Sequence, residues 1–390
     1  MRILHVITRL VHGGAQANTL STALWHARWG HEVAVATGLE AGPEGQLLDA
    51  ARASSIPIHP IPALVREPSP ARDLRALAQL ARLMRSTRWD VIHTHTSKAG
   101  FLGRLAARAG PRAAVVHTPH GHIFDAYYGP LRTRFYVQLE RFAARLTDVM
   151  VALTPRERAD TLERRIATAQ QFVVVPSGID RLAFAPRGEA QRKQERARLE
   201  LAPEAFVIGC VGRLSPVKGQ IHLLEALRLM ASKLDAARLV LVGDGPERAR
   251  LERAAAELGI AARVRFTGRV ADPAPLYAAF DVVAVPSLNE GMGRVIIEAM
   301  AADVAVAASA VGGIPDLVRD GETGLLARAR DAEALAAACL RIAADPGLAG
   351  RLSARARTEV LPGYDVEAMA RRLLEVYEQA LVTVRGKRGS

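Results

Sequence analysis

Short apolar runs with strand-like composition alternate with helical segments along the whole chain, and this alternation restricts the folds that the chain can adopt. In the segment 72–86, for example, leucines recur about one helical turn apart. Strands that alternate with helices of this length predict parallel βαβ units whose sheets are covered by helices. The apolar runs lie at 3–8, 32–37, 90–95, 113–118, 148–153 and 171–176 in the first half, and at 206–212, 238–243, 263–268, 281–287, 303–309 and 324–327 in the second.

The two series of strands predict two domains. The chain has 390 residues, which is more than one ordinary core requires. Between the two series, residues 185–203 are polar and flanked by proline, as expected of a linker that runs into a short helix. We therefore predict an α/β protein with two Rossmann-like, doubly wound domains joined near residues 180–203. Ligands of such sheets bind at the carboxyl ends of the strands, so a cleft between the domains is the expected site.

The composition is typical of a globular protein from a reducing compartment. Hydrophobic residues make up 49% of the chain and charged residues 24%, which excludes a disordered protein. Cys210 and Cys339 lie far apart in apolar surroundings, and we interpret them as reduced core residues. The N-terminal segment lacks the features of a secretory signal, and no apolar stretch is long enough for a transmembrane helix. A cytoplasmic protein is therefore expected.

The net charge of +12 indicates a polyanionic partner or an anionic surface. The segment 101–145 is rich in arginine and contains only Asp125 and Glu140 as acidic residues. Two interpretations remain open, a solvated helical face or a patch that contacts anionic lipid headgroups at the inner face of the membrane. Nucleic acid is not expected, because the chain lacks zinc-ligand spacing and an aromatic-rich strand. The arginines of this segment are Arg104, Arg108, Arg112, Arg132, Arg134, Arg141 and Arg145.

Two loops that follow strands have the composition of phosphate-binding loops. Gly13 and Gly14 lie between the first strand and a helix, where backbone amides can approach a phosphate, although two such glycines also suit an ordinary turn. Arg213 and Lys218 follow the first strand of the second half and precede an amphipathic helix. Two cations on such a loop can bind a diphosphate; the alternative is a surface loop with chance cations.

Histidines cluster after two strands of the first half. His120 and His122 follow one strand, and their spacing suits loop residues better than metal ligands on one helix face, so we expect no metal. A polar contact between His120 and a substrate sugar or leaving group is the favoured interpretation, and a structural histidine is the alternative. His95 and Lys98 follow the other strand and are candidates to contact an acceptor, although core or capping roles suit them equally.

Glu290 and Glu298 lie in and after a glycine-containing loop of the second half. If a helix begins near Gly293, Glu298 lies in its first or second turn, where the helix dipole contributes only about 0.3–1 kcal/mol. This is too little to offset burial, and a hydroxyl-bearing ligand is the better explanation, because carboxylates accept hydrogen bonds from vicinal hydroxyls. The alternative is a buried glutamate that pairs with a local cation such as Arg294.

The motifs together resemble those of the retaining, nucleotide-sugar-dependent glycosyltransferases of family 4, which have a two-domain B-type fold. GRLSPVKG, LVLVGDGPERARLE, VRFTG, PSLNEGMGRVIIEAMA and VGGIPDLVRDGETGLL occur in the family's order, and the resemblance extends over nearly the whole chain. It implies an N-terminal acceptor-binding domain over 1–180, a C-terminal donor-binding domain over 181–363, and a last helix over 364–385 that returns to the first domain.

The resemblance also implies roles for individual residues. Arg213 and Lys218 match the pair that binds the donor diphosphate, and Glu298 matches the residue that holds the donor ribose. Met292 stands where the family often has phenylalanine, and Arg294 where it often has leucine, which leaves the sugar open. The remaining matches are Glu290 and the amides of Gly291, Met292 and Gly293 at the transferred sugar, His120 near the reacting carbon, Gly13 and Gly14 near the diphosphate, and Val270 at the base.

The implied activity is transfer of a hexose from a UDP- or GDP-sugar to a hydroxyl of a glycan, lipid-linked or small-molecule acceptor, in the synthesis of cell-surface polysaccharide. The chain contains no Asp-x-Asp pair, which suits a metal-independent reaction in which Arg213 and Lys218 replace the cation. One alternative is a nucleotide-sugar epimerase of the same fold. Another is a non-catalytic protein that binds a nucleotide-sugar or a polyanion.

Overall fold

The computed structural model describes the chain except for residues 40–46, 48–50, 53, 55, 122–128 and 387–390. The chain divides into two compact units. Unit 1 comprises Met1–Gly178 and Val366–Ser390, and unit 2 comprises Ile179–Asp365. Each unit contains one sheet, and every strand pairing within the two sheets is parallel. The predicted α/β class with two parallel sheets is therefore confirmed.

The sheet of unit 1 has seven strands in the order β3-β2-β1-β4-β5-β6-β7. The strand order reverses at β1. On one side of β1 the sheet continues with β2 and β3, and on the other side it continues with β4 to β7. The strands are β1 (Arg2–Arg9), β2 (Glu32–Gly38), β3 (Ile58–Pro60), β4 (Val91–His95), β5 (Ala114–Thr118), β6 (Val149–Ala152) and β7 (Phe172–Val174). The helices include α1 (Gly14–Arg28), α3 (Pro70–Ser86), α4 (Ser97–Ala107), α5 (Pro130–Ala144), α6 (Pro155–Glu163) and α14 (Val366–Gly386).

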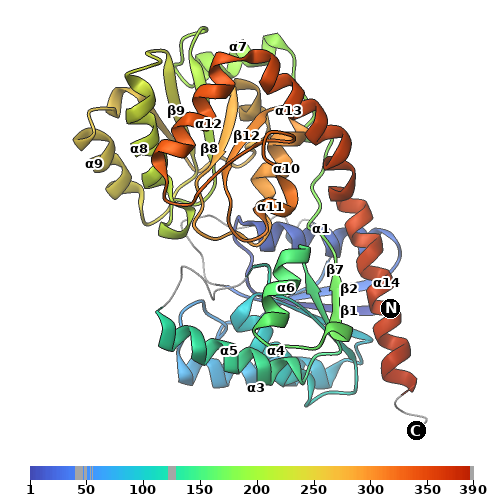
Figure 1. Ribbon diagram of the computed structural model, residues 1–390. Coiled ribbons are helices and arrows are strands. Elements are labelled where there is room, and N and C mark those ends of the chain that lie inside the picture. The colour runs from blue at the N-terminus through green and yellow to red at the C-terminus, as the bar shows by residue number, and fades with distance from the viewer. Residues whose placement is uncertain (40–46, 48–50, 53, 55, 122–128, 387–390) are drawn as a thin grey trace. The chain divides into compact units, whose positions relative to one another are not determined.

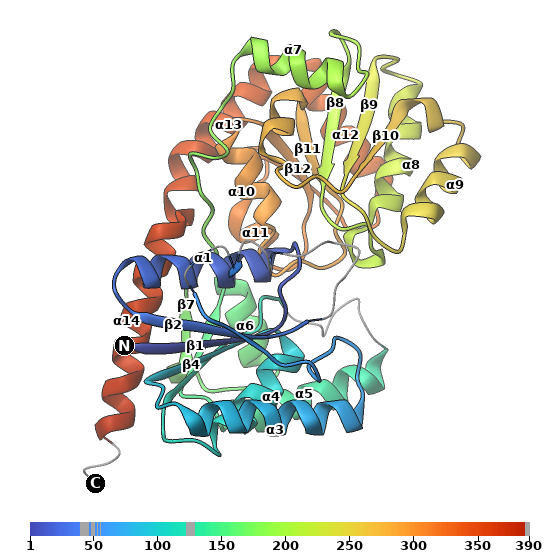
Figure 2. The same ribbon diagram turned by 180° about the vertical axis from the view of Figure 1, so that it is seen from behind.

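Helices cover both faces of this sheet because alternate residues of each strand point to opposite faces. In β1, Ile3 and Ile7 belong to the core on one face, and Leu4 and Val6 belong to the core on the other. The first of these cores includes apolar residues of α1 and α14, which lie side by side (Figures 1 and 2). Helices α3 and α4 supply the second core. The final helix therefore completes the core of the unit in which the chain begins.

The sheet of unit 2 has six strands in the order β10-β9-β8-β11-β12-β13. Helices α8, α9 and α12 contribute leucines to one core with this sheet. The strands are β8 (Phe206–Val211), β9 (Ala237–Val242), β10 (Val264–Gly268), β11 (Val282–Val285), β12 (Ala305–Ser309) and β13 (Leu325–Ala327). The helices are α7 (Glu189–Arg198), α8 (Gln220–Ala231), α9 (Arg248–Glu257), α10 (Arg294–Ala301), α11 (Ile314–Leu317), α12 (Ala332–Ala344) and α13 (Pro346–Glu359).

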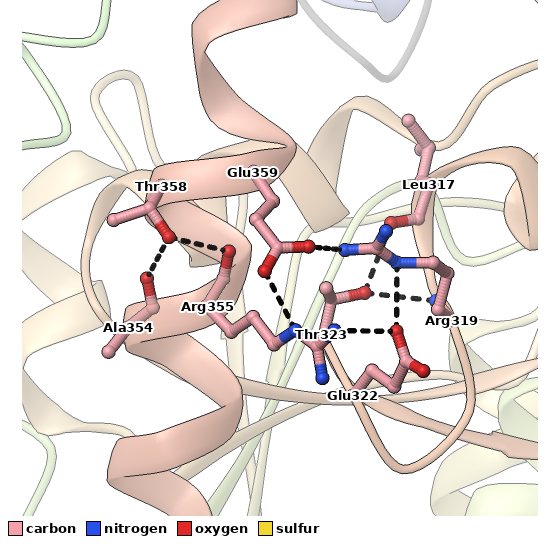
Figure 3. A network of polar contacts seen from close by, with 8 residues as sticks. All are labelled: Leu317, Arg319, Glu322, Thr323, Ala354, Arg355, Thr358 and Glu359. Atoms are coloured by element: carbon pink, nitrogen blue, oxygen red, sulfur yellow. Dashed lines mark hydrogen bonds and ion pairs between the residues drawn. The ribbon is translucent and has the colours of Figure 1, made fainter.

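The loop between α11 and β13 is tied to α13 by a network of ion pairs (Figure 3). Arg319 pairs with Glu322 and Glu359, and Arg355 pairs with the same two carboxylates. The Oγ1 atom of Thr323 accepts the backbone N–H of Arg319 at 2.9 Å. Isolated surface pairs contribute only about 0–1 kcal/mol each, but four charges that share partners hold the loop in one place. No helix in the described part of the chain is long and apolar enough to span a membrane.

Replacement of Tyr377 by phenylalanine should destabilise unit 1. The hydroxyl of Tyr377 in α14 lies 2.5 Å from Nδ1 of His93 in β4, and both side chains are buried. Tyr377→Phe leaves that nitrogen without its partner, so we expect the free energy of unfolding to fall by about 1–3 kcal/mol in urea titrations. Tyr364→Phe is the matched control, since the hydroxyl of Tyr364 has no hydrogen-bond partner among the described residues. Equal losses in the two variants would contradict the prediction.

Candidate active site

The candidate site of unit 2 lies where the neighbouring strands β8 and β11 end. Parallel strands bring their carboxyl ends to one edge of the sheet, so the loops that follow them meet there. The loop after β8 continues into a short 3₁₀ turn, Pro216–Lys218, and the loop after β11 leads to α10. The backbone N–H of Leu288 donates to the carbonyl of Val217 at 2.8 Å. Residues about seventy positions apart in sequence are thus joined through their main chains.

Lys218 and Glu290 form an ion pair across these two loops. The Glu290 carboxylate is mostly buried and also accepts the hydroxyl of Ser287 at 3.0 Å. Gly219 has a φ of +64°, and a Cβ there would lie 2.1 Å from the carbonyl oxygen of Pro286. Glycine is therefore required for the close approach of the two loops. The structure brings together Lys218 and Glu290, two of the residues that the sequence singled out.

A third loop, after β12, holds the backbone of Glu290. The N–H of Gly313 donates to the carbonyl of Glu290 at 3.0 Å. Gly312 has a φ of +51°, and a Cβ there would lie 1.9 Å from the same carbonyl oxygen. Three consecutive strand ends, β8, β11 and β12, therefore fix the position of one carboxylate. The sequence analysis did not identify the role of these glycines, which depends on contacts between loops.

Glu298 lies in the second turn of α10, which begins at Arg294 after Gly293 at a φ of +85°. Its side chain has two protein partners. The hydroxyl of Tyr277 donates to Oε2 at 2.8 Å, and Nε of Arg294 lies 3.6 Å from Oε1. Burial raises the pKa of Tyr277 well above its ordinary value, and the charge of Glu298 raises it further. The protein thus solvates this carboxylate, and its burial does not by itself require a ligand.

Tyr277 is a residue that the sequence analysis missed. It lies in a 3₁₀ segment, Ala274–Ala279, between β10 and β11, and only the fold brings it beside α10. The 3.6 Å distance between Nε of Arg294 and Oε1 of Glu298 supports in part the alternative in which Arg294 pairs with Glu298. A carboxylate can accept about four hydrogen bonds, so Glu298 retains capacity for ligand hydroxyls beyond these two partners.

The other predicted residues of unit 2 surround this arrangement. Arg213 follows β8, and its carbonyl accepts from Nε2 of Gln220 at 2.9 Å. Met292 is only 3% exposed, so its side chain is packed inside the unit, while Gly291 beside it is half-buried. Val270 is half-buried after β10. Burial raises the pKa of the Cys210 thiol to about 12, although the nearby Lys218 acts in the opposite direction. The thiol therefore stays neutral beside the ion pair.

In unit 1, His120 follows β5 and is held in place by a buried carboxylate on α6. His120 has a φ of +60°, and Gly121 beside it has a φ of +101°. The N–H of Gly121 donates to Oε1 of Glu157 at 2.9 Å, and the N–H of Leu153 donates to Oε2 at 2.6 Å. Glu157 therefore links the loop after β5 to the end of β6. The sequence analysis did not identify Glu157, since nothing local distinguishes it from a surface glutamate.

His95 lies behind His120 rather than at the surface. It is 1% exposed, its Nδ1 lies 2.9 Å from Nε2 of His120, and its Nε2 lies 3.0 Å from Nδ1 of His5. Both ring nitrogens are thus engaged within the protein. For His95, this arrangement favours the core role over direct contact with an acceptor, the two interpretations that the sequence left open.

The other predicted residues of unit 1 are placed as follows. Lys98 pairs with Asp73 at 2.6 Å, which ties α4 to α3 and makes it a structural cation. Gly13 and Gly14 are exposed at the start of α1. His122 lies outside the described residues.

Among the described residues of unit 1, five histidines are buried in or beside the sheet: His5, His26, His93, His95 and His117. One ring nitrogen each from His5, His93 and His95 lies within 4.8 Å of the others, a spacing that would suit a metal ion. All the ring nitrogens of these three residues except His5 Nε2 already have hydrogen-bond partners. We therefore interpret the group as neutral imidazoles bonded to one another and to their neighbours.

Burial keeps these imidazoles uncharged. Desolvation, with a smaller contribution from the nearby His26, lowers the pKa of His5 from its ordinary value of 6.5 to about 3. Desolvation lowers the pKa of His26 to about 4, although a hydrogen bond to the carbonyl of Ala370 opposes the shift. The pKa values of His93 and His95 are lowered well below 6.5 by burial and then by neighbouring histidines. Unit 1 therefore has a neutral polar centre at physiological pH.

Two parallel-sheet α/β units with polar residues at the carboxyl ends of their strands define the class of two-domain B-type glycosyltransferases. Residues 13–178 match the model of the glycosyl transferase 4-like domain, and residues 191–359 match that of glycosyl transferases group 1. The chain belongs to this glycosyltransferase family, and the predicted resemblance is confirmed.

Named relatives cover nearly the whole chain. It is 33% identical to a D-inositol 3-phosphate glycosyltransferase of Actinosynnema mirum, over 94% of this chain and 92% of the relative. It is 29% identical to the UDP-Gal:alpha-D-GlcNAc-diphosphoundecaprenol alpha-1,3-galactosyltransferase of Escherichia coli, over 88% of each chain. A crystal structure of Anabaena HepE in complex with UDP-glucose superposes with a TM-score of 0.84 at 25% identity, over 97% of this chain and 100% of HepE.

The buried histidines predict that stability falls in mild acid. The folded-state pKa values of His5 and His26 lie below the value of 6.5 that these two residues regain on unfolding, so the unfolded chain binds more protons at these sites. The stability that they contribute is present above pH 6.5 and is lost as pH falls toward the folded values. We expect each to lower the free energy of unfolding by about 2 kcal/mol between pH 7 and pH 5. Urea titrations at both pH values measure this difference.

His26→Gln provides the control for this prediction. It removes one titrating group, so the loss of unfolding free energy between pH 7 and pH 5 should be about 2 kcal/mol smaller than in the wild type. An unfolding free energy that is the same at pH 7 and pH 5 would contradict the neutral burial of these residues.

Proposed function

We propose that the protein is a retaining glycosyltransferase that transfers a hexose from a UDP-sugar to a hydroxyl of a lipid-linked or glycan acceptor in cell-surface polysaccharide synthesis. The observation that carries the proposal is the Lys218–Glu290 pair, which three strand ends hold at the edge of the unit 2 sheet. A UDP-sugar is favoured over a GDP-sugar because the Escherichia coli relative is named for UDP-Gal and the HepE structure contains UDP-glucose.

In this proposal, unit 2 binds the donor. Arg213 and Lys218 contact the diphosphate, and Lys218 has three N–H donors, so it can keep Glu290 while it donates to a phosphate oxygen. Glu290 and the amides of Gly291, Met292 and Gly293 bind the hexose, and Glu298 accepts the ribose hydroxyls. Gly13 and Gly14 of unit 1 approach the diphosphate through their amides. Val270 contacts the base through its backbone.

The transfer itself breaks the bond between the anomeric carbon and the diphosphate oxygen. Arg213 and Lys218 stabilise the negative charge that develops on the leaving diphosphate. The acceptor oxygen bonds to the anomeric carbon from the same face, and its proton passes to the departing phosphate oxygen, so the configuration is retained. His120 contacts the donor near the reacting carbon. Because the two cations supply the positive charge, we propose that the reaction needs no metal ion.

Variants of Lys218 and Glu298 should separate turnover from donor binding. Lys218→Ala removes a charge that acts most strongly on the leaving group, and we expect kcat to fall about 100–1,000-fold. Glu298→Gln keeps a similar shape beside Tyr277 but loses the charged acceptor, and we expect the Kd for UDP to rise about tenfold or more. Titration calorimetry with UDP and GDP, with and without EDTA, measures binding, and UDP release in the presence of acceptor measures turnover.

Glu225 on α8, whose side chain is 45% exposed and lies 3.1 Å from Nδ1 of His222, provides a matched control, and Glu225→Gln should behave as the wild type does. Tight binding of UDP that EDTA leaves unchanged is the expected result. Binding of neither nucleotide would overturn the proposal and return attention to the non-catalytic alternative. Conversion of the donor without any acceptor would instead indicate the epimerase.

We further propose that α5 docks unit 1 on the anionic surface of the membrane's inner face. Leu131, Phe135 and Phe142 lie along one side of this helix and are 84%, 60% and 47% exposed. The exposed Arg132 and Arg134 flank them, and neither has an acidic partner among the described residues. Glu140, also on α5, is held by the buried Arg104 at 2.8 Å. An exposed apolar stripe flanked by arginines suits anionic lipid, where each cation contributes about 1 kcal/mol.

Vesicle binding tests this surface. We expect the protein to sediment with vesicles of phosphatidylglycerol and phosphatidylcholine but not with phosphatidylcholine alone, and binding should weaken with salt. The Phe135→Ser variant should bind at least about tenfold more weakly, since burial of one such side chain is worth about 1.5–3 kcal/mol. Leu182→Ser, at an 87% exposed leucine of unit 2, is the control. Equal binding by the two variants would exclude α5 as the docking surface.

A further inference from the structure

A chain of hydrogen bonds between histidines leads from the interior of unit 1 to His120. Nδ1 of His5 in β1 lies 3.0 Å from Nε2 of His95, at the end of β4. Nδ1 of His95 lies 2.9 Å from Nε2 of His120, after β5. Because β1, β4 and β5 are neighbours in the sheet, residues at and beyond the ends of β4 and β5 can reach one another and His5, which brings each ring beside the next. The rings of His5 and His95 are stacked, with centroids 5.2 Å apart and planes inclined by 22°.

The surroundings keep the two inner rings uncharged. His5 and His95 are buried, and the groups that face them are also histidines, namely His26, His93 and His117. A neutral imidazole has one N–H donor and one acceptor nitrogen. In a chain of such rings, each hydrogen bond has its donor on one side, so the direction of one bond fixes the direction of the next.

The inner end of the chain selects that direction. Nε2 of His5 is buried and has no hydrogen-bond partner among the described residues. If Nε2 carried the proton of His5, an N–H donor would be buried without an acceptor. Among backbone groups such orphaned donors are rarer than under-satisfied acceptors, and we apply the same preference to this imidazole. The proton of His5 therefore belongs on Nδ1, where it is donated to His95. His95 then donates from Nδ1 to Nε2 of His120.

We propose that His5 and His95 are positioning residues that hold His120 as the tautomer with its proton on Nδ1. In that form His120 is a neutral hydrogen-bond donor through Nδ1, and it cannot act there as a base. The oxygen that receives this hydrogen bond is a hydroxyl of the donor hexose, a statement that rests on the proposed function. The tautomer itself rests only on the geometry within unit 1.

Nitrogen-15 spectra of histidine-labelled protein test the tautomer without any substrate. Two-bond proton–nitrogen correlations distinguish a protonated ring nitrogen from a bare one, and His120→Gln identifies the His120 signals by their loss. We expect a protonated Nδ1 and a bare Nε2 on His120 in the wild-type protein near pH 7. A proton on Nε2, or on both nitrogens, would overturn the inference whether or not the protein proves to be a glycosyltransferase.

Two variants of His95 distinguish positioning from mere packing. His95→Phe keeps a stacked ring but removes both hydrogen bonds, so His120 should populate the Nε2 tautomer and kcat should fall about tenfold, with the Kd for UDP unchanged. His95→Asn retains an N–H that can replace the Nδ1 donor, and it should restore the Nδ1 tautomer and much of kcat. Loss of kcat in both variants with an unchanged tautomer would refute the positioning role. If either variant fails to fold, the wild-type spectrum still decides.

Discussion

The candidate site of unit 2 depends on one constraint, the arrival of parallel strands at a common edge. The loops after β8, β11 and β12 meet there because the strands are neighbours in the sheet, and main-chain hydrogen bonds join the loops to one another. The ion pair between Lys218 and Glu290 is a product of this arrangement. Its glycines carry no chemistry, yet any side chain at Gly219 or Gly312 would push the loops apart. The position of the Lys218–Glu290 ion pair therefore depends on the backbone of the surrounding loops.

The sequence predicted those parts of the molecule that follow from local pattern. Alternating strands and helices indicated parallel sheets, and the ends of those strands indicated where polar residues would gather. The contact between Lys218 and Glu290 was not predicted and was found only in the structure. Contacts that depend on strand order or on packing could not be predicted in this way. Tyr277 reaches Glu298 only after two elements have packed together. His5 gave no signal inside an apolar strand, because its partner His95 is ninety positions away.

The two units bury their polar groups by different physical means. Unit 2 keeps charges and pairs them, as in the contact of Glu298 with Tyr277 and Arg294, so that each carboxylate has defined partners. Unit 1 buries imidazoles that burial renders neutral, and these bond to one another and to hydroxyl groups. The first solution keeps charged groups at fixed positions inside the fold. The second fixes hydrogen-bond direction without charge, which is the property that a ring behind His120 requires.

Helix α14 follows unit 2 in the chain but belongs to unit 1. Its residues Met369, Leu373 and Val376 complete one of the two cores of that unit. During synthesis, the sheet of unit 1 emerges first, but the face that α1 shares with α14 stays only partly covered until residues 366–386 have been made. All the residues of unit 2 are synthesised before that point, so it can fold while the first unit is unfinished. Unit 1 thus begins first along the chain but is completed last.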